Sequence, residues 1–220
     1  SSQSELTFDK IKCIDFLKNK NVKVANSFIL NKDDSLNVNE IINHVGLPCF
    51  VKASNSGSSF GVYKVYKTND LVDTINKAKK YDDNILIESF INGREFSVGV
   101  VNYNNQIIVL PITEIITSND FFDYQAKYEG KSEEITPAVI ENNLKIKLEK
   151  IAKKIYKTLK IKGLSRSEFI LKDNEFYFLE INTVPGLSKE SILPQQSIQA
   201  GIPIDKLFAS TIYEAMENTN

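Results

Sequence analysis

Hydrophobic residues along the chain recur with two different periods, and the changes between them predict the order of helices and strands. Apolar residues spaced three or four positions apart, as on one face of a helix, occur in residues 9–20, 36–45, 69–80, 136–159, 191–200 and 204–217. Alternating runs, or runs rich in β-branched and aromatic residues, occupy residues 22–30, 48–53, 62–66, 84–90, 95–102, 106–116, 165–171 and 176–182. Hairpins are more evident than crossover units, so the pattern predicts an α+β fold with antiparallel sheets.

Capping residues and breaks refine two of these elements. Thr7 is the candidate N-cap of the first helix, because a hydroxyl oxygen can accept a bond from the free N–H groups there. Thr136 and Pro137 suit the N-cap and the first position of the helix that ends before Gly163. Residues 117–136 show no periodic pattern and are long for a connection, so we interpret them as a functional lid.

The overall composition excludes several classes of protein. The 27 basic and 28 acidic side chains leave no net basic field for nucleic acid. No apolar run approaches the length of a membrane span, and residues 1–10 are polar, unlike a signal peptide. We expect a cytoplasmic protein of one domain or two small ones, with small-molecule substrates and no nucleic-acid or membrane partner.

Cysteine and histidine are too scarce to carry the chemistry. Cys13 and Cys49 stand far apart in apolar surroundings, so we expect small core residues and not a disulfide or a zinc site. His44 is the single histidine and is expected to be structural, at the surface or partly buried. Any reaction must therefore depend on carboxylates, lysines, arginine, hydroxyls and metal.

Two oxygen-bearing side chains close the last predicted strand. Glu180 and Asn182 are two residues apart, so they project from the same face while Ile181 turns into apolar packing. A carboxylate and an amide oxygen suit magnesium, which commonly bridges nucleotide phosphates. The alternative is a solvated or helix-capping acid, which is the commoner role of an acid near the end of a strand.

The preceding strand strengthens the metal interpretation. Residues 165–171 and 176–182 have the pattern of the two strands of a hairpin. Glu168 is opposite Glu180 if the loop between the strands has an odd number of residues. A three-residue turn at 173–175 meets this condition, whereas a two-residue turn needs a compensating bulge. Arg166 then lies on the same face as Glu168.

A loop rich in glycine and serine follows Lys52. In residues 54–61, Gly57 and Gly61 let the backbone approach an anion, and serine hydroxyls can donate to it. A strand and not a helix is expected after the loop, which distinguishes it from a P-loop. A plain hairpin turn is the alternative, but Lys52 and the metal strand favour anion binding.

Ordered motifs over essentially the whole chain match one family. They are Phe8-Asp9-Lys10, Phe50-Val51-Lys52 before Gly57-Ser58-Ser59-Phe60-Gly61, Ile87-Glu88 before Gly93-Arg94-Glu95, Tyr124-Gln125-Ala126-Lys127-Tyr128, Gly163-Leu164-Ser165-Arg166, and Leu179-Glu180-Ile181-Asn182-Thr183-Val184-Pro185-Gly186. With these motifs the chain resembles the C-terminal two-thirds of D-alanine D-alanine ligases, members of the ATP-grasp superfamily. The resemblance implies two α+β lobes that grip ATP between antiparallel sheets: a central lobe at 1–90, with the phosphate loop 54–61, and a C-terminal lobe at 91–220, with the metal site and the lid.

The resemblance also implies a role for each matching residue. On the nucleotide side, the phosphates would be bound by Lys10, Lys52, Lys127 and Ser59, adenine by Glu88, Ser89, Phe90 and Ile91, and the ribose by Glu95. On the side of the chemistry, two magnesium ions, or manganese in their place, would be bound by Glu168, Glu180 and Asn182. Arg166 and the Gly186 amide would stabilise the tetrahedral intermediate, and Ser58, Tyr128 and Ser191 would place or activate the amino acids. The implied reaction joins two D-alanines through an acyl phosphate for peptidoglycan synthesis.

The chain departs from the family pattern at two points. Glu168 stands where these ligases usually carry aspartate, and the N-terminal substrate domain of the family is not seen before Ser1. We therefore expect a fragment that binds ATP but forms the dipeptide poorly, with the missing domain as its partner and a homodimer left open. The alternatives are an ATP-grasp ligase of another amino acid or carboxylate, an ATP and magnesium binding module that is inactive in isolation, and a relative without catalysis. The presence of Arg166, Glu180, Asn182 and the three phosphate-binding lysines argues against the last.

Overall fold

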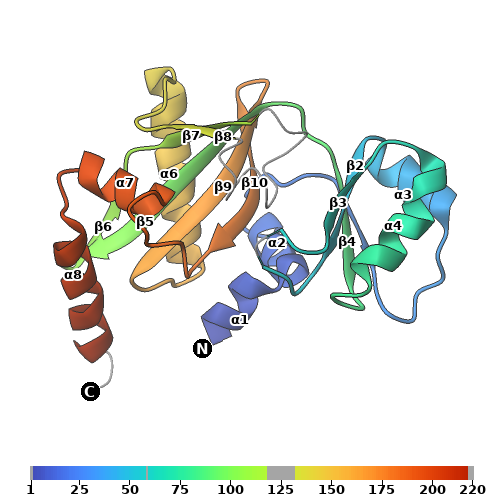
Figure 1. Ribbon diagram of the computed structural model, residues 1–220, viewed down its shortest axis with the longest axis horizontal. Coiled ribbons are helices and arrows are strands. Elements are labelled where there is room, and N and C mark those ends of the chain that lie inside the picture. Colours follow the sequence, from blue (N-terminus) through green and yellow to red (C-terminus); the bar gives the residue numbers. More distant parts are fainter. Residues whose placement is uncertain (1, 58, 118–131, 218–220) are drawn as a thin grey trace.

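The computed structural model describes residues 2–57, 59–117 and 132–217, which fold around two antiparallel sheets (Figure 1). The smaller sheet has the strand order β1-β4-β2-β3. Its strands are β1 (Ser27–Leu30), β2 (Cys49–Ala53), β3 (Val62–Val65) and β4 (Ile85–Ser89). Helices α3 (Val38–Val45) and α4 (Leu71–Ala78), the latter preceded by a 3-10 turn at Thr68–Asp70, cover the face turned away from the large sheet. The antiparallel α+β prediction is confirmed.

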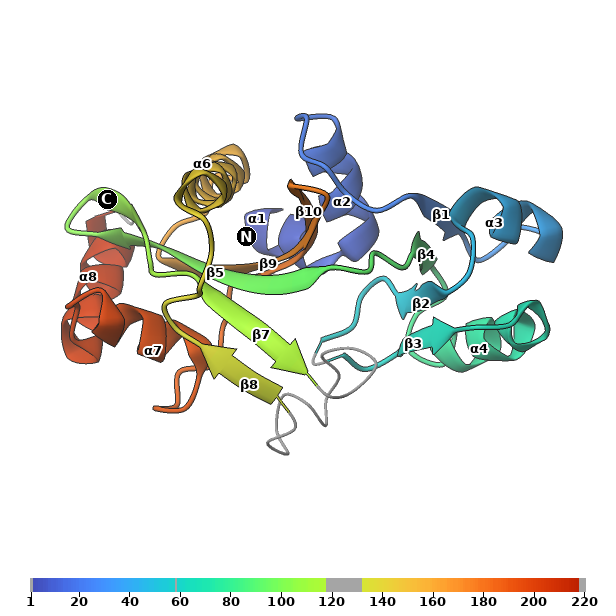
Figure 2. The ribbon, with the colours of Figure 1, turned by 90° about the horizontal axis from the view of Figure 1, so that it is seen from above.

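The larger sheet has the order β10-β9-β5-β7-β8, with β6 paired to β5. Its strands are β5 (Arg94–Tyr103), β6 (Gln106–Val109), β7 (Thr113–Thr117), β8 (Ser132–Ile135), β9 (Leu164–Lys172) and β10 (Glu175–Asn182). Helix α6 (Asn142–Thr158) packs on one face, while α7 (Ile192–Gln199) and α8 (Ile204–Glu217) pack on the other (Figure 2). Each face therefore has its own apolar core.

The N-terminal helices α1 (Ser2–Phe8) and α2 (Lys10–Lys18) lie between the two sheets. Three residues of α2, Cys13, Ile14 and Leu17, are buried in the same core as Phe96 of β5 and Phe178 of β10. The chain thus begins against the large sheet, crosses to the small one and returns through β4 to β5. The division into two lobes at residue 90 stays a prediction. Helix α2 lies before that boundary in the sequence but packs into the core of the large sheet.

Both predicted helix starts are wrong. Thr7 lies inside α1 and donates to the Gln3 carbonyl oxygen, 3.0 Å away. Asp9 is the N-cap of α2: its backbone is extended and its Oδ1 accepts from the Lys12 N–H at 3.1 Å. The long helix begins at Asn142 and not at Thr136. Tertiary bonds to the first residue of β7 and to the residue before it hold the preceding segment out of the helix: the Thr136 hydroxyl lies 2.6 Å from that of Thr113, and the Ala138 N–H donates to Ile112 O.

Three predicted segments are shorter or divided in the structure. The strand expected at 106–116 splits into β6 and β7 around Pro111, which has no N–H to offer a ladder. The strand expected at 22–30 is limited to Ser27–Leu30. Residues 132–135 of the expected lid form β8, a strand too short to be recognised from its alternation, and residues 118–131 lie outside the described part.

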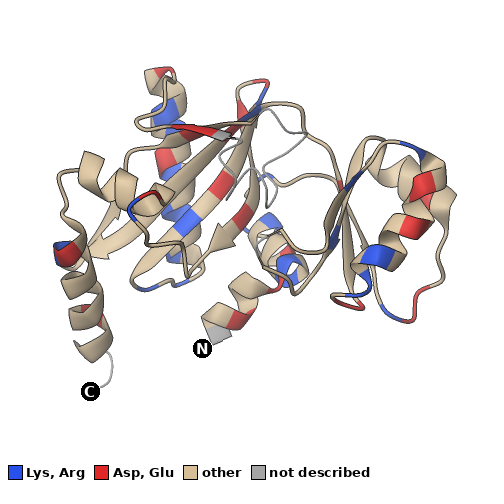
Figure 3. Ribbon diagram, in the orientation of Figure 1, with Lys and Arg blue, Asp and Glu red and all other residues tan. Residues whose placement is uncertain are grey.

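The two cysteines lie in the core, and the histidine lies at the surface. Cys13 and Cys49 are buried free thiols, and burial raises their pKa to about 12 and about 11, respectively. His44 is exposed. Acidic and basic residues are interspersed along the chain (Figure 3), and no helix in the described ranges is long and apolar enough to cross a membrane.

Candidate active site

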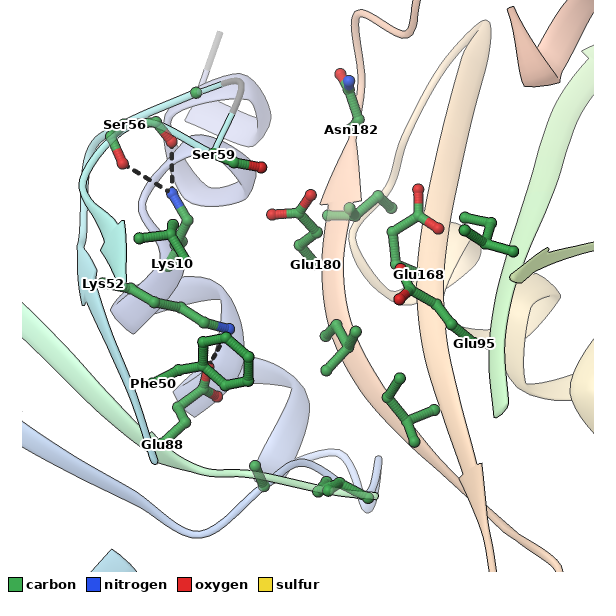
Figure 4. Close-up of a pocket in the computed structure, with 18 of the residues that line it drawn as sticks. Lys10, Phe50, Lys52, Ser56, Ser59, Glu88, Glu95, Glu168, Glu180 and Asn182 are labelled. Atoms are coloured by element: carbon green, nitrogen blue, oxygen red, sulfur yellow. Dashed lines mark hydrogen bonds and ion pairs between the residues drawn. The ribbon is translucent and has the colours of Figure 1, made fainter. Parts of the chain in front are cut away.

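A cavity of about 1190 Å³ lies between the two sheets, with residues of α1 and α2 at its edge (Figure 4). Its wall contains most of the residues predicted to bind nucleotide or metal. Those in the wall are Lys10, Lys52, Ser59, Glu88, Ser89, Phe90, Ile91, Glu95, Glu168, Glu180 and Asn182. Residues far apart in the sequence and in different sheets therefore share one cavity.

The other predicted site residues are not brought into that wall. Arg166, Gly186 and Ser191 are described but do not line the cavity. Arg166 contacts a residue of the wall: its Nε donates to Glu168 Oε1 at 2.8 Å. Gly186 packs close to Ser191: a Cβ added at Gly186 would lie 2.8 Å from the Ser191 Oγ. Ser58, Lys127 and Tyr128 fall outside the described residues.

The β9/β10 hairpin carries the candidate metal ligands. Its turn has two residues, Asp173 and Asn174, with φ of 51° and 60°, so the three-residue turn is wrong. These left-handed values suit the turn type that matches the twist of paired strands. The register shifts between Phe178 and Glu180, which is the compensating bulge, and Glu180 stands directly opposite Glu168.

Glu168 is nearly buried and only half satisfied. Its side chain is 6% exposed. Oε1 accepts from Arg166 Nε at 2.8 Å and from the Ser97 hydroxyl at 3.4 Å. Oε2 is buried and has no hydrogen-bond partner among the described residues. A buried carboxylate oxygen without a donor is costly, so this atom fits a bound cation.

Glu180 and Asn182 extend the candidate metal site along β10 (Figure 4). Asn182 Oδ1 already accepts from the Val184 N–H at 2.9 Å, although an amide oxygen has a second lone pair. Within the described ranges, no group of three or more His, Cys, Asp or Glu side chains could hold a metal ion. An ion here would have two carboxylates and one amide as protein ligands, and water and phosphate oxygens would complete the shell that magnesium prefers.

Arg166 is embedded among carboxylates. Burial alone would lower its pKa, but Glu168 foremost, then Glu180 and Glu134, hold the pKa of Arg166 above its ordinary value. Glu134, in β8, is a neighbour that sequence reasoning missed. Burial raises the pKa of Glu134, and Arg166 opposes that shift. The sequence does not indicate which face of the sheet Glu134 occupies, because its short strand β8 lies within the segment interpreted as the lid.

Lys52 and Glu88 form an ion pair in the small sheet. Lys52 Nζ lies 2.5 Å from Glu88 Oε2, and their side chains are 15% and 3% exposed. Burial opposes the charge of Lys52, but Glu88, with smaller effects of Glu180 and Glu95, raises its pKa. The two residues come from neighbouring strands, where Glu88 is opposite Phe50 and Lys52 opposite Leu86. The phosphate role of Lys52 and the adenine role of Glu88 stay predictions, and here the two side chains contact each other.

Lys10 holds the loop of residues 54–61. Its Nζ donates to the Ser56 carbonyl oxygen at 2.5 Å and lies 3.4 Å from the Ser56 hydroxyl (Figure 4). At the start of the loop, the Ser54 hydroxyl donates to Asp9 Oδ1 at 2.7 Å. Helix α2 is thus attached to the loop through both its N-cap and its first residue. A strand, β3, follows the loop as predicted.

Apolar residues complete the cavity wall, and the sequence analysis gave them no role in the site. Phe50 and Ile170 are examples: each lies two residues from a predicted ligand, Lys52 and Glu168, on the same strand face. The two-residue period could have found both. Phe50 also packs on Phe90, with ring centroids 6.1 Å apart. They give the cavity an apolar side suited to a flat ring system.

The comparison with known proteins decides the family. Residues 16–213 match the family described as D-ala D-ala ligase C-terminus. The chain belongs to this family. The D-alanine–D-alanine ligase of Flavobacterium johnsoniae is 55% identical over 210 residues, which cover 96% of this chain and 65% of that protein. That of Christiangramia forsetii is 51% identical, over 97% of this chain and 66% of its own length. This member of the D-ala D-ala ligase C-terminus family therefore spans less than two thirds of either relative.

Solved structures agree with that assignment. The D-alanine–D-alanine ligase from Bacillus anthracis complexed with ATP has a TM-score of 0.83 and 26% identity, over 98% of this chain and 68% of its own. The VanG D-Ala:D-Ser ligase from Enterococcus faecalis has a TM-score of 0.81 and 28% identity, over 96% and 62%. The ATP-grasp fold expected from the resemblance is confirmed.

Proposed function

We propose that this chain is the nucleotide- and metal-binding part of an ATP-dependent ligase that joins two D-alanines for peptidoglycan synthesis. The observation that carries the proposal is the opposition of charges in one cavity. Glu168 and Glu180 on the large sheet face Lys10 and Lys52, which come from α2 and the small sheet. Family membership and relatives named as D-alanine–D-alanine ligases support the choice of reaction.

In the proposed reaction, the carboxylate of one D-alanine attacks the γ-phosphate of ATP, which releases ADP and leaves an acyl phosphate. The amine of the second D-alanine then attacks the acyl carbon and phosphate departs. Lys10 and Lys52 would hold phosphate oxygens, so Lys52 would have to exchange its contact with Glu88 for the nucleotide. Arg166 would neutralise the oxyanion that forms at the acyl carbon.

The metal ligands would be Glu168, Glu180 and Asn182. Magnesium bound there would neutralise charge on the phosphates and hold them in line for transfer. The orphan Oε2 of Glu168 supports this assignment, because a cation would satisfy it. Glu168 keeps its other oxygen engaged with Arg166, so the same side chain would connect the metal to the oxyanion site.

Two measurements test the proposal. Calorimetry on the chain should detect ATP binding that magnesium strengthens, and the absence of any nucleotide binding would refute it. The second assay uses a protein in which this chain is joined to the additional segment that its relatives carry. It should release phosphate from ATP only when D-alanine is present. Activity with another carboxylic acid and none with D-alanine would assign a different ATP-grasp reaction.

One comparison gives a reason to test an alternative, in which the second amino acid is not D-alanine. A neighbour of almost equal structural similarity is named as a D-Ala:D-Ser ligase. Supplying D-alanine with either D-alanine or D-serine, and identifying the dipeptide by mass spectrometry, would distinguish the two products. The cytoplasmic location, the N-terminal partner domain and the oligomeric state stay predictions.

A further inference from the structure

The side chain of Gln196 is buried between helix α7 and the large sheet. It is 0% exposed, although glutamine is usually found at the surface. Its Nε2 donates two hydrogen bonds, to the carbonyl oxygen of Ser97 and to the hydroxyl of Thr113, both at 2.9 Å. A single amide therefore connects α7 with two neighbouring strands, β5 and β7.

The two acceptors stand in the same transverse row of the sheet as the candidate metal ligands. Ser97 is directly opposite Thr113 on one side and Glu168 on the other, and Glu168 is opposite Glu180. Directly opposed residues share a face, so these side chains project together. The Ser97 hydroxyl lies 3.4 Å from Glu168 Oε1. The amide of Gln196 is thus joined to Glu168 through one residue.

Strand β5 has a glycine, Gly99, where it packs against the side chain of Gln196. A Cβ added at Gly99 would lie only 2.5 Å from Gln196 Oε1, so a larger residue at Gly99 would exclude the amide. Gly99 is opposite Arg166, the residue that donates to Glu168. Gln196 Oε1 is itself buried and has no hydrogen-bond partner in the described part of the chain. An apolar side chain would avoid this unsatisfied acceptor, which indicates that the two donor bonds are what the position requires.

We propose that Gln196 is a positioning residue that holds the row formed by Ser97 and Thr113 and, through Ser97, orients Glu168 toward the metal site. The inference rests on the proposed function, since it assumes that Glu168 binds magnesium. Without the two bonds, β5 and α7 would be free to shift relative to each other. Glu168 would then lose the fixed geometry that magnesium demands of its ligands.

The test is the effect of magnesium on ATP binding by the chain, measured by calorimetry with and without the metal. Gln196→Met keeps the length of the side chain and removes both donors. It should reduce the enhancement by magnesium about tenfold, the lower end of the range for residues that orient metal ligands, and leave metal-free ATP binding unchanged. Gln199→Met is the matched control, because it makes the same change on an exposed position of α7. It should behave as the wild type.

A double-mutant cycle with Glu168→Gln separates positioning from general stability. If Gln196 acts through Glu168, then Gln196→Met should not alter the magnesium effect further in the Glu168→Gln background. An unchanged enhancement in Gln196→Met, or an equal loss in both backgrounds, would overturn the proposal. If Gln196→Met does not fold, Ser97→Ala removes only the hydroxyl next to Glu168 and should lower the enhancement in the same direction; no change would likewise overturn it.

The wild-type measurement keeps the two proposals apart. Wild-type protein whose ATP binding does not respond to magnesium would contradict the proposed metal site, and with it this role of Gln196. Wild-type protein that responds, with a Gln196→Met variant that responds equally, would contradict the role of Gln196 alone.

Discussion

Glu168 and Glu180 are directly opposed across β9 and β10 because a bulge shifts the register between Phe178 and Glu180. With a two-residue turn and no bulge, the residue opposite Glu168 would be Leu179. The extra residue brings two carboxylates together on the cavity face, where their mutual repulsion favours a cation between or beside them.

Replacing Glu180 by Gln should weaken magnesium-dependent ATP binding by about tenfold or more, since a carboxylate ligand becomes a neutral amide. Metal-free ATP binding should remain or improve slightly, because one negative charge near the phosphates is removed. Calorimetry at several magnesium concentrations measures both effects. Glu175→Gln is the control: it removes a charge from the same strand at the hairpin end. An unchanged magnesium requirement in Glu180→Gln would disprove the ligand role.

The turn of the same hairpin gives a prediction for stability. Asn174 is exposed and has a φ of 60°, a conformation that asparagine tolerates and β-branched residues do not. Asn174→Val should lower the free energy of unfolding by about 1–2 kcal/mol, as measured by urea denaturation. Asn174→Gly should leave it unchanged or raise it, because glycine adopts the left-handed region without strain. Equal stability of the two variants would contradict the left-handed assignment.

Much of the site follows from the two-residue period of strands. From the order of residues alone, that rule puts Glu168 with Arg166 and Glu180 with Asn182, but it leaves the turn as a choice between two lengths. The choice depends on whether asparagine and aspartate both adopt positive φ, which neither residue requires. The residues around Lys52 already indicate an anion-binding loop, and the family resemblance adds Lys10 and Lys127 and assigns the loop and the metal strand to one nucleotide site.

The features that could not be predicted from the sequence are contacts between segments far apart along the chain. Residues 136–140 have the pattern of a helix start, but bonds from Thr136 to Thr113 and from Ala138 to Ile112 hold them out of the helix. Gln196 has the pattern of one polar residue in an amphipathic helix, and its partners lie about a hundred positions earlier in β5 and more than eighty in β7. The pairing of Lys52 with Glu88 likewise requires the strand order of the small sheet.

Removing one member of the buried pair Lys52 and Glu88 should destabilise the chain strongly. Lys52→Met leaves the Glu88 carboxylate buried without its cation, which typically costs about 3–5 kcal/mol of unfolding free energy. The double variant Lys52→Met/Glu88→Met should recover much of that loss, because no unpaired charge remains. Lys32→Met, which breaks an exposed pair with Asp83, should leave the unfolding free energy almost unchanged. Additive effects in the double variant would show that the two charges do not interact.

The same pair gives a prediction for the pH dependence of stability. Glu88 and, more weakly, Glu180 and Glu95 raise the pKa of Lys52 above its ordinary value of 10.5, against the effect of burial. A pKa that is higher in the folded state means that the folded chain holds this proton more tightly. The stabilisation is therefore complete below the ordinary value and is lost as the pH rises through the folded one.

The measurement is the difference in unfolding free energy between the wild type and Lys52→Met/Glu88→Met, from urea denaturation between about pH 8 and about pH 11. Tyrosines and other lysines titrate in both proteins, so the difference isolates the pair. The difference should stay constant up to the pH range in which lysine ordinarily titrates. Above it, the unfolding free energy of the wild type should fall relative to that of the double variant, as Lys52 loses its proton. A difference that shifts in favour of the wild type in that range would mean that burial outweighs the carboxylates and that the pKa of Lys52 is lowered.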